Sequence, residues 1–400
     1  MTDHAGSAAL DRLSFLLADV KDGIGPFLAV FLTSAQHWSP GRAGIALTIG
    51  GVATVIARAP AGALVDAVTA KRRLIALSAV AVAGAAAVMA RWPQFWPVVV
   101  AQAVNGVADA IFPAAVAAIS LGMVGRARFT ARVGRNEAFN HAGNVLTAIA
   151  AGLAGSYLAP NAVLWIVAAL AGLVLWPLAA IRPGAIDYAV ARGADPGVAG
   201  VRPATRTLLV FTAAITLFHF ANAAMLPLLG EELARRRPQA SALFIAACIV
   251  TAQAAMVPMA ILVGHRADRW GRKRLFLVGF AVLPIRGVLY TLVHHPAALI
   301  AIQLLDGVGA GIFGALFLIV VADLTQGSGR YNLAQGAAAA AWGLGAALSN
   351  GVAGYIVDGF GFDAAFLFLA GCAAAAFLLF WLAVPETRGW AQHRAAVRLG

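Results

Sequence analysis

Charged side chains and cysteines are both scarce in this sequence. Only 12% of its 400 residues are charged, whereas 61% are hydrophobic. A soluble domain carries roughly 25% charged residues, so the composition excludes an ordinary soluble protein. The two cysteines, Cys248 and Cys372, fall in apolar stretches. We expect them to be small buried side chains that give no information about the redox compartment.

Sequence motifs for catalysis and nucleotide binding are also missing. There is no Walker loop, no H-E-x-x-H, no C-x-x-C and no G-x-S-x-G. The Gly309–Gly314 stretch matches G-x-G-x-x-G, but it lies inside an apolar run without a βαβ context and is better explained by close helix packing. We therefore expect no enzyme, no cofactor, no metal site and no direct use of ATP.

Long apolar runs recur along the whole chain, each close to the about 20 residues that a helix needs to cross a bilayer. They lack the short alternating segments of a membrane β-barrel. The polar first residues, without a cleavage-like site, do not resemble a signal peptide. The sequence predicts twelve membrane-spanning helices, at 13–34, 43–65, 74–91, 95–123, 137–158, 161–181, 207–229, 241–263, 275–293, 297–324, 335–357 and 363–384.

The net charge of +12 could suggest a nucleic-acid partner. The basic residues, however, lie mostly between the predicted spans, as in Lys71–Arg73 and Arg272–Arg274. With the N-terminus inside, most of them fall in cytoplasmic loops, and the outer run Arg235–Arg237 is an exception. We therefore expect no nucleic-acid partner, but a multi-pass protein of the cell (inner) membrane with both termini in the cytoplasm.

The two halves of the sequence repeat each other. The segment Gln102–Ala114 resembles Gln303–Ala315, and Gly62–Asp66 resembles Gly264–Asp268, both about two hundred residues further along. In a membrane protein, two matching halves indicate a transporter with a substrate site between them. We expect six-helix bundles at 1–182 and 206–400, joined at 183–205 by a cytoplasmic linker rich in Gly, Ala and Pro.

One loop carries a family resemblance. The run from Gly264 to Arg274 resembles the signature G-x-x-x-D-R-x-G-R-K/R of the major facilitator superfamily, and a degraded copy follows Gly62. The resemblance covers nearly the whole chain. It implies an all-α integral membrane protein of twelve transmembrane helices in two pseudo-symmetric six-helix bundles, working as a monomer in the lipid bilayer.

The resemblance also implies that this loop latches the cytoplasmic ends of the halves when the site faces outward. A simple topology anchor is the alternative, above all for Asp66. The expected cytoplasmic latch consists of Gly62, Asp66, Gly264, Asp268, Arg269, Gly271 and Arg272.

Polar residues inside the spans are candidates for a substrate or proton cavity, because in lipid they need a partner, a cavity or water. In the family the first and seventh helices line the cavity. The first predicted span carries Asp19, Lys21 and Asp22, and the seventh carries His219 and Asn222 on one face. The alternative is that Asp19, Lys21 and Asp22 lie close to the interface and snorkel.

Asn105 and Asp109 share one face of the fourth span. Asp109 is the strongest candidate for a proton or cation site, and a structural ion pair is the alternative. Arg58 is the natural partner of Asp109 or of Asp22. Asp306 takes the place of Asn105 in the second half.

The fifth span carries a polar stripe of Glu137, Asn140, His141 and Asn144. His141 is suited to proton exchange. Hydrogen bonds between helices explain Asn140 and Asn144 equally well, and pairing with loop arginines does so for Glu137. The weaker candidates are Gln253, Trp342, Asn350 and Arg286, and Arg286 has no clear role because the ninth helix is peripheral in the family.

These residues predict a secondary transporter that moves a small organic solute by alternating access. Proton-coupled efflux by antiport is favoured. However, Gly143–Gly155 lacks the Gly-Pro pair that is common in antiporters of the family. Proton-coupled import of a polar or zwitterionic metabolite remains an alternative, and so does a non-transporting receptor on the same fold.

Overall fold

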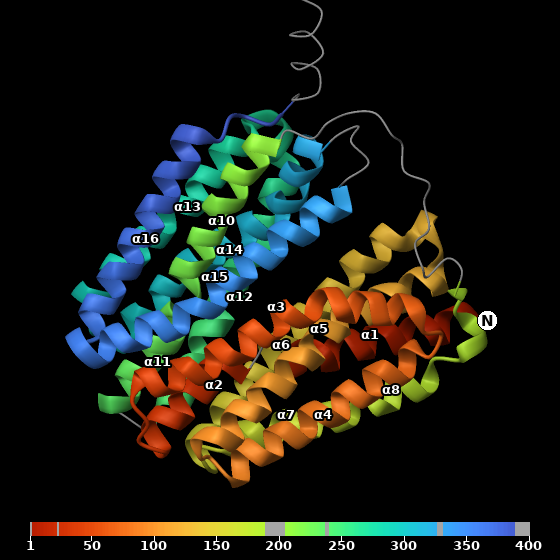
Figure 1. The fold of residues 1–400 in the computed structure, drawn as a ribbon, viewed down its shortest axis with the longest axis horizontal. Helices are drawn as coiled ribbons and strands as arrows, with labels where there is room; N and C mark the ends of the chain where they lie inside the picture. The colour runs from red at the N-terminus through yellow and green to blue at the C-terminus, as the bar shows by residue number, and fades with distance from the viewer. Residues whose placement is uncertain (1, 22–23, 189–204, 237–239, 326–330, 389–400) are drawn as a thin grey trace, which may run out of the picture. The chain divides into compact units, whose positions relative to one another are not determined.

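The computed structural model describes residues 2–21, 24–188, 205–236, 240–325 and 331–388, and within these ranges every regular element is a helix (Figure 1). The fold class predicted from the sequence is confirmed. Each of the twelve predicted spans coincides with one helix or with consecutive short ones.

The first six predicted spans correspond to nine consecutive elements, because the first and the sixth span are interrupted. These elements are α1 (Thr2–Lys21), α2 (Ile24–Val30), the π-helical turn η1 (Phe31–Ala35), α3 (Pro40–Ala67), α4 (Lys71–Arg91), α5 (Phe95–Val124), α6 (Arg126–Tyr157), α7 (Ala162–Leu173) and α8 (Leu175–Ala180).

After the 3₁₀ turn η2 (Pro183–Ala185), the helices of the second half repeat the same order of lengths. They are α10 (Thr205–Ala223), α11 (Met225–Arg236), α12 (Ser241–Trp270), α13 (Arg272–Leu292), α14 (Pro296–Thr325), α15 (Tyr331–Phe360) and α16 (Phe362–Ala383).

Nine helical stretches in the described part of the chain are long and apolar enough to cross a membrane. The stretches around α1, α6 and α15 are not among them. Charged residues such as Asp11 and Arg12 lower the hydropathy of α1, the polar stripe lowers that of α6, and α15 is rich in weakly apolar Ala and Gly.

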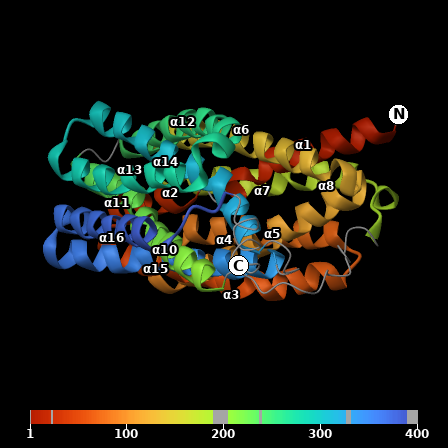
Figure 2. The same cartoon turned by 90° about the horizontal axis from the view of Figure 1, so that it is seen from above.

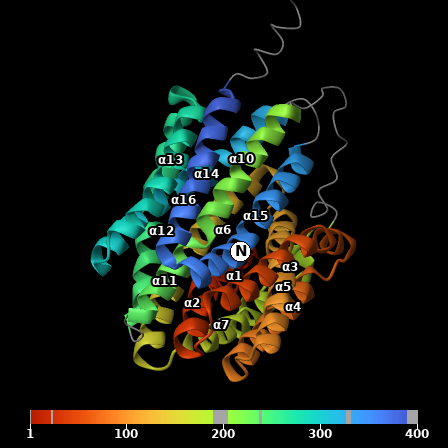
Figure 3. The same cartoon turned by 60° about the vertical axis from the view of Figure 1, so that its left-hand side comes forward.

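The chain divides into two compact units. Unit 1 comprises Met1–Asp195 and Gly230–Ala247, and unit 2 comprises Pro196–Leu229 and Cys248–Gly400. In unit 1 the main helix contacts are α3 with α5, α4 with α5, and α1 with α6 (Figure 3). In unit 2 they include α13 with α14 and α10 with α15 (Figure 2). The boundaries expected for the two halves remain a prediction.

Glycines mark the closest helix contacts, and they do so at equivalent places in both units. A Cβ atom on Gly106 of α5 would collide with the carbonyl oxygen of Gly50 on α3. A Cβ atom on Gly307 of α14 would likewise collide with the carbonyl oxygen of Ala252 on α12. Small residues allow helix backbones to approach closely in membranes. Each unit therefore contains the same backbone contact at the segment that the sequence repeats.

A second pair of glycines follows the same rule. A Cβ atom on Gly143 of α6 would collide with the carbonyl oxygen of Phe15 on α1, and one on Gly345 of α15 would lie 2.7 Å from that of Thr216 on α10. The duplicated architecture thus extends to a second pair of helix contacts, α1 with α6 and α10 with α15.

The cores of the two units differ in composition. Unit 1 is filled mainly by aliphatic side chains, among them Leu10, Leu13, Ile75 and Met89. Unit 2 has an aromatic core in which the Phe280 and Phe380 rings stack at 4.8 Å. Many other large apolar side chains are exposed, as expected for helices that face lipid.

Candidate functional site

Asn105 and Asp109 lie half-buried on α5, on the helix face that continues through Phe112 and Val116. The Asn105 amide nitrogen donates a hydrogen bond to Gln102 Oε1 at 3.4 Å. Asn105 Oδ1 is buried and has no hydrogen-bond partner in the described part of the chain. Unsatisfied buried polar atoms are rare in folded proteins, so this face of α5 has an unused acceptor one turn from Asp109.

The four residues of the polar stripe on α6 differ in their exposure to solvent. Asn140 is buried, His141 and Asn144 are half-buried, and Glu137 is exposed. Glu137 and Asn140 line a pocket of unit 1, with an empty volume of about 560 Å³ that includes the part open to solvent. Asn144 Oδ1 is buried without a described hydrogen-bond partner. Of the four residues of the stripe, only Glu137 and Asn140 therefore line this pocket.

An ion-pair network ties α1 to the start of α6. The buried Arg132 guanidinium donates to Asp11 Oδ1 at 2.5 Å, and Arg135 donates to Asp11 Oδ2 at 2.7 Å. Arg132 also donates to Asn136 Oδ1 at 2.8 Å. The loop arginines considered as partners of Glu137 thus include two that bind Asp11 instead.

This network controls the ionisation of Asp11. Burial raises the pKa of the carboxyl group, but the hydrogen bonds from Arg135 and Arg132 outweigh it and hold the pKa below its usual range. Sequence reasoning missed Asp11 because it precedes the first predicted span. The available signal was that Ser7, Asp11 and Ser14 share one helix face.

The remaining candidates of unit 1 are described less fully. Arg58 is half-buried on α3, whose backbone contacts α5 closely, and its pairing with Asp109 or Asp22 remains a prediction. Six predicted residues lie outside those whose side chains the structure describes, namely Asp19, Lys21, Asp22, Asp66, Gly264 and Asp268.

In unit 2 the structure gives Arg286 a clear place. Its side chain, only 1% exposed, reaches from α13 to form an ion pair with the Asp306 carboxylate on α14. It also donates to Asn222 Oδ1 on α10 at 2.5 Å. Two predicted cavity residues, Asp306 and Asn222, are thus held by an arginine for which the sequence suggested no role. Asp306 retains a side-chain exposure of 21%.

His219 lies in an aromatic surrounding. Its ring stacks on Trp342 at 4.4 Å and meets the edge of Phe313 at 4.4 Å. His219 Nε2 is buried and has no hydrogen-bond partner among the described residues. Although His219 and Asn222 share a helix face, as predicted, their side chains enter different environments.

The signature loop has two partners that sequence reasoning did not identify. Arg272 Nε lies 3.3 Å from Asp323 Oδ2 on α14. The backbone N–H groups of Arg272 and Lys273, at the start of α13, donate to the two carboxylate oxygens of Glu386 at 2.9 and 3.2 Å. The Glu386 carboxylate thus accepts hydrogen bonds from backbone N–H groups that have no partner within the first turn of a helix.

The other latch residues are described only in part. The Arg269 carbonyl accepts a hydrogen bond from the Arg388 side chain at 3.1 Å. Gly271 has a backbone φ of 89°, which favours glycine. Gly62 on α3 has open space where a Cβ atom would be. The corresponding loop of unit 1 is held by two other basic residues at the start of α4. Lys71 donates to the Val65 carbonyl, and Arg72 donates to Leu178 O at 2.9 Å.

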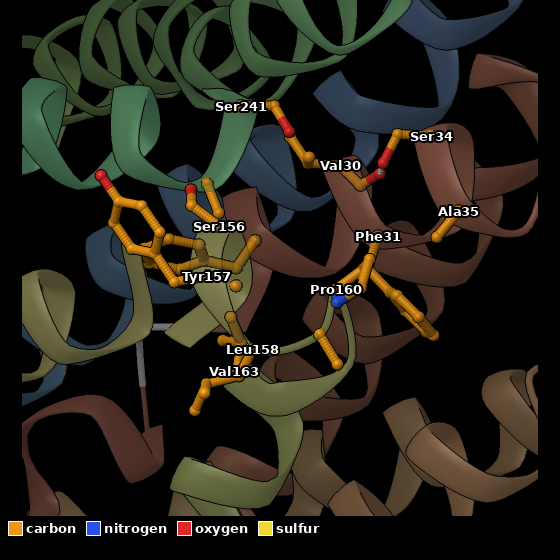
Figure 4. Close-up of a pocket in the computed structure, with 14 residues that line it drawn as sticks. Val30, Phe31, Ser34, Ala35, Ser156, Tyr157, Leu158, Pro160, Val163 and Ser241 are labelled. Atoms are coloured by element: carbon orange, nitrogen blue, oxygen red, sulfur yellow. Dashed lines mark hydrogen bonds between the residues drawn. The ribbon is translucent and has the colours of Figure 1, made fainter. Parts of the chain in front are cut away.

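A second pocket of unit 1 lies beside η1, the end of α6 and the start of α12, with an empty volume of about 700 Å³ that includes open solvent (Figure 4). Two of its hydroxyl groups are engaged, because Ser156 Oγ accepts from the Leu243 N–H at 3.1 Å and Ser34 Oγ donates to Val30 O at 2.6 Å. None of the predicted cavity residues lines this pocket.

Duplicated helical units, with polar clusters on helices long enough to cross a bilayer, are typical of membrane transporters. Comparison with known proteins agrees. The sequence model of the Major Facilitator Superfamily matches residues 13–218 and again residues 207–398, and the chain belongs to this family. It is a transporter and not an enzyme, as expected from the sequence.

Two Mycobacterium tuberculosis proteins, each named an uncharacterized MFS-type transporter, are 49% identical to this chain over 388 residues, covering 95% of it and 93% of each relative. The multidrug transporter protein MdtP of Bacillus subtilis is 31% identical over 103 residues, which are 26% of this chain and 18% of MdtP.

Solved structures agree on the fold. The nucleoside transporter NupG superposes with a TM-score of 0.78 at 15% identity, over 94% of this chain and 98% of NupG. A D-xylose–proton symporter superposes with a TM-score of 0.69 at 15% identity, over 97% of this chain and 98% of the symporter. At these identities the likeness establishes the shared fold alone.

Proposed function

We propose that this protein is a secondary active transporter that exports a small organic solute by alternating access, in exchange for protons. The observation that carries the proposal is the position of Asp109. It is a half-buried carboxylate near the middle of α5, a thirty-residue apolar helix. An ionisable group at this depth of a membrane span needs a partner, a cavity or water and is a functional candidate by default, and protonation of Asp109 would remove its charge.

The substrate or proton cavity proposed here consists of Asp19, Lys21, Asp22, Arg58, Asn105, Asp109, Asn140, His141, Asn144, His219, Asn222 and Asp306. Within it we assign the exchangeable proton to Asp109 rather than to Asp306. Asp306 is already part of the buried ion pair with Arg286 of α13, which gives it a structural role. The signature loop, from Gly264 to Arg272, serves as the conformational latch.

Two observations bear on the direction. The local similarity to a multidrug transporter protein favours efflux of a partly apolar solute. The mixed charges of Asp109, Arg58 and Asp306 suit a polar or zwitterionic metabolite as well, which keeps proton-coupled import as the second candidate.

The basic starts of α4 and α13 favour a cytoplasmic location for that end of each unit. We therefore infer that both termini lie in the cytoplasm. By its family resemblance we further propose that the protein is a monomer of the inner membrane. Labelling of cysteines introduced singly at Thr69 and Trp92, which flank the two ends of α4, in a variant without Cys248 and Cys372 would test this orientation in intact cells.

Transport in proteoliposomes under an imposed pH gradient tests the coupling. Solutes would first be selected by the thermal stabilisation that a bound ligand gives to the purified protein. Asp109→Asn should abolish gradient-driven flux and keep the protein folded. The matched control is Asp363→Asn, which changes an exposed carboxylate at the start of α16. Full gradient-driven flux in Asp109→Asn would remove Asp109 from the mechanism.

A further inference from the structure

The pocket between α1, α5 and α6 has the mixed apolar and polar walls of a small-molecule site. Its empty volume of about 560 Å³ includes space that is open to solvent, so the pocket is a partly open one. Its walls are mostly apolar and come from three helices. The apolar lining is Leu17 of α1, Phe112, Pro113, Val116 and Ala117 of α5, and Val133 of α6.

Four polar residues line the same pocket, and one of them has an unused hydrogen-bonding group. Both polar atoms of the Asn136 amide are already hydrogen-bonded, because Oδ1 accepts from Arg132 and Nδ2 donates to Ser120 Oγ at 3.0 Å. Ser14 is only 6% exposed, and its Oγ has no hydrogen-bond partner in the described part of the chain. A buried hydroxyl that lines a cavity without a partner indicates that a ligand or water completes it.

Glu137 provides the charge of the pocket. Arg135 is two positions away on the same helix, so its side chain projects elsewhere, and it binds Asp11. Arg132 binds Asp11 too. No ion pair links Glu137 to any side chain that the structure describes. The pocket thus combines apolar walls with a carboxylate that no described cation neutralises.

The pocket also lies next to the proposed coupling residue. Pro113 lines it and is four positions from Asp109 on α5, which corresponds to about 6 Å along the helix axis. A ligand in the pocket is therefore within electrostatic range of Asp109.

We propose that this pocket binds an organic cation, a protonated amine attached to an apolar body, with Glu137 as counter-ion and the Ser14 hydroxyl as a hydrogen-bond partner. The inference rests on the proposed transport function and specifies its substrate class. Neutral molecules of the same shape fit the walls but lack the attraction to Glu137, and anions are repelled.

Binding of two isosteric probes tests the charge. Calorimetry on the full-length protein in lipid nanodiscs, corrected with empty nanodiscs, would compare 2-(1-naphthyl)ethylammonium with 2-(1-naphthyl)ethanol. The wild type should bind the ammonium about two- to fivefold more tightly, the size of effect expected of a solvent-screened ion pair. Glu137→Gln should remove this preference and leave the affinity for the alcohol within about twofold. Glu232→Gln, in the ion pair with Arg236, is the matched control and should change neither.

Two further variants separate the pocket from a general charge effect. Ala117→Leu narrows the cavity and should weaken the binding of both probes. Ser14→Ala removes the unpaired hydroxyl, so the free protein should be at least as stable as the wild type, whereas the affinity for the ammonium should fall severalfold. A purely structural Ser14 would leave the affinity unchanged.

Equal binding of the two probes by the wild type, or an undiminished preference in Glu137→Gln, would overturn the inference. These outcomes are distinct from failure of the proposed function. If the probes show no preference while Asp109→Asn still abolishes gradient-driven flux of another solute, only the pocket proposal fails. If the probes bind as expected while Asp109→Asn transports normally, the coupling proposal fails and the pocket proposal stands.

Discussion

Arg286 on α13 and Asp306 on α14 form a buried ion pair in unit 2, and the same guanidinium donates to Asn222 on α10. Three helices are thereby connected through one side chain. Removing one partner from a buried ion pair is far more costly than removing both, because the remaining charge has lost its counter-ion.

We therefore expect Arg286→Leu to destabilise the protein by about 3–5 kcal/mol. Adding Asp306→Leu should recover much of the lost stability, because the double variant leaves no unpaired charge at this site. Thermal unfolding of both variants in the same detergent measures the effect. A double variant that is less stable than Arg286→Leu would show that the pair is not the source of the loss.

The glycine contacts between helices make a prediction with a control on the same helix. Gly307→Ala places a methyl group against the Ala252 carbonyl, whereas Gly314→Ala on α14 meets nothing within 4 Å. Overpacking of this kind costs about 1–3 kcal/mol. Gly307→Ala should lower the unfolding midpoint, while Gly314→Ala should leave it unchanged or raise it, because alanine is the better helix former.

The repeat in the sequence could be recognised because this contact permits few residue types. Gly106 and Gly307 lie within the repeated segments, where a side chain would push the helices apart. The corresponding contact of Gly143 and Gly345 was not recognised as a repeat, because the residues that surround these two glycines in the sequence differ, although the backbone contact is of the same kind.

The polar candidates were found less completely than the fold. Helical spacing predicts which face of its own helix carries Asn222 and which carries Asp306. It does not predict that a long side chain from a third helix reaches both residues, so Arg286 had no predicted role. Asp11 and Glu386 were missed because they lie outside the predicted spans, where charged residues attract no attention.

Asp11 leads to a pH-dependent prediction. Its folded-state pKa is below the unfolded value of about 3.9, because the hydrogen bonds from Arg135 and Arg132 outweigh the effect of burial. A carboxyl group with a lowered folded pKa stabilises the protein above the unfolded pKa, and this contribution is lost as the pH falls through the folded value. Asp11→Asn should therefore be less stable than the wild type at pH 7, and the gap should narrow below about pH 4.

Unfolding midpoints of the wild type and of Asp11→Asn between pH 3 and pH 7 would measure this gap. Asp363→Asn, at an exposed carboxylate, controls for the general effect of removing one negative charge. A gap that stays constant over the whole range would show that the charge of Asp11 does not stabilise the fold.

Two glycines at helix starts allow the contribution of Glu386 to be isolated. Gly271 precedes α13 with a φ of 89°, and Gly361 precedes α16 with a φ of 86°. Alanine is strained in this backbone region by about 1–3 kcal/mol. A Cβ atom on Gly271 would in addition collide with the Glu386 carboxylate, whereas one on Gly361 meets nothing within 4 Å.

Gly361→Ala should therefore show the backbone strain alone, and Gly271→Ala the strain together with displacement of Glu386 from the start of α13. In a Glu386→Ala background the extra cost at Gly271 should disappear, so that both glycine substitutions lower the unfolding midpoint by similar amounts. If Gly271→Ala stays the more damaging of the two in that background, its extra cost arises from another contact and Glu386 does not hold the start of α13.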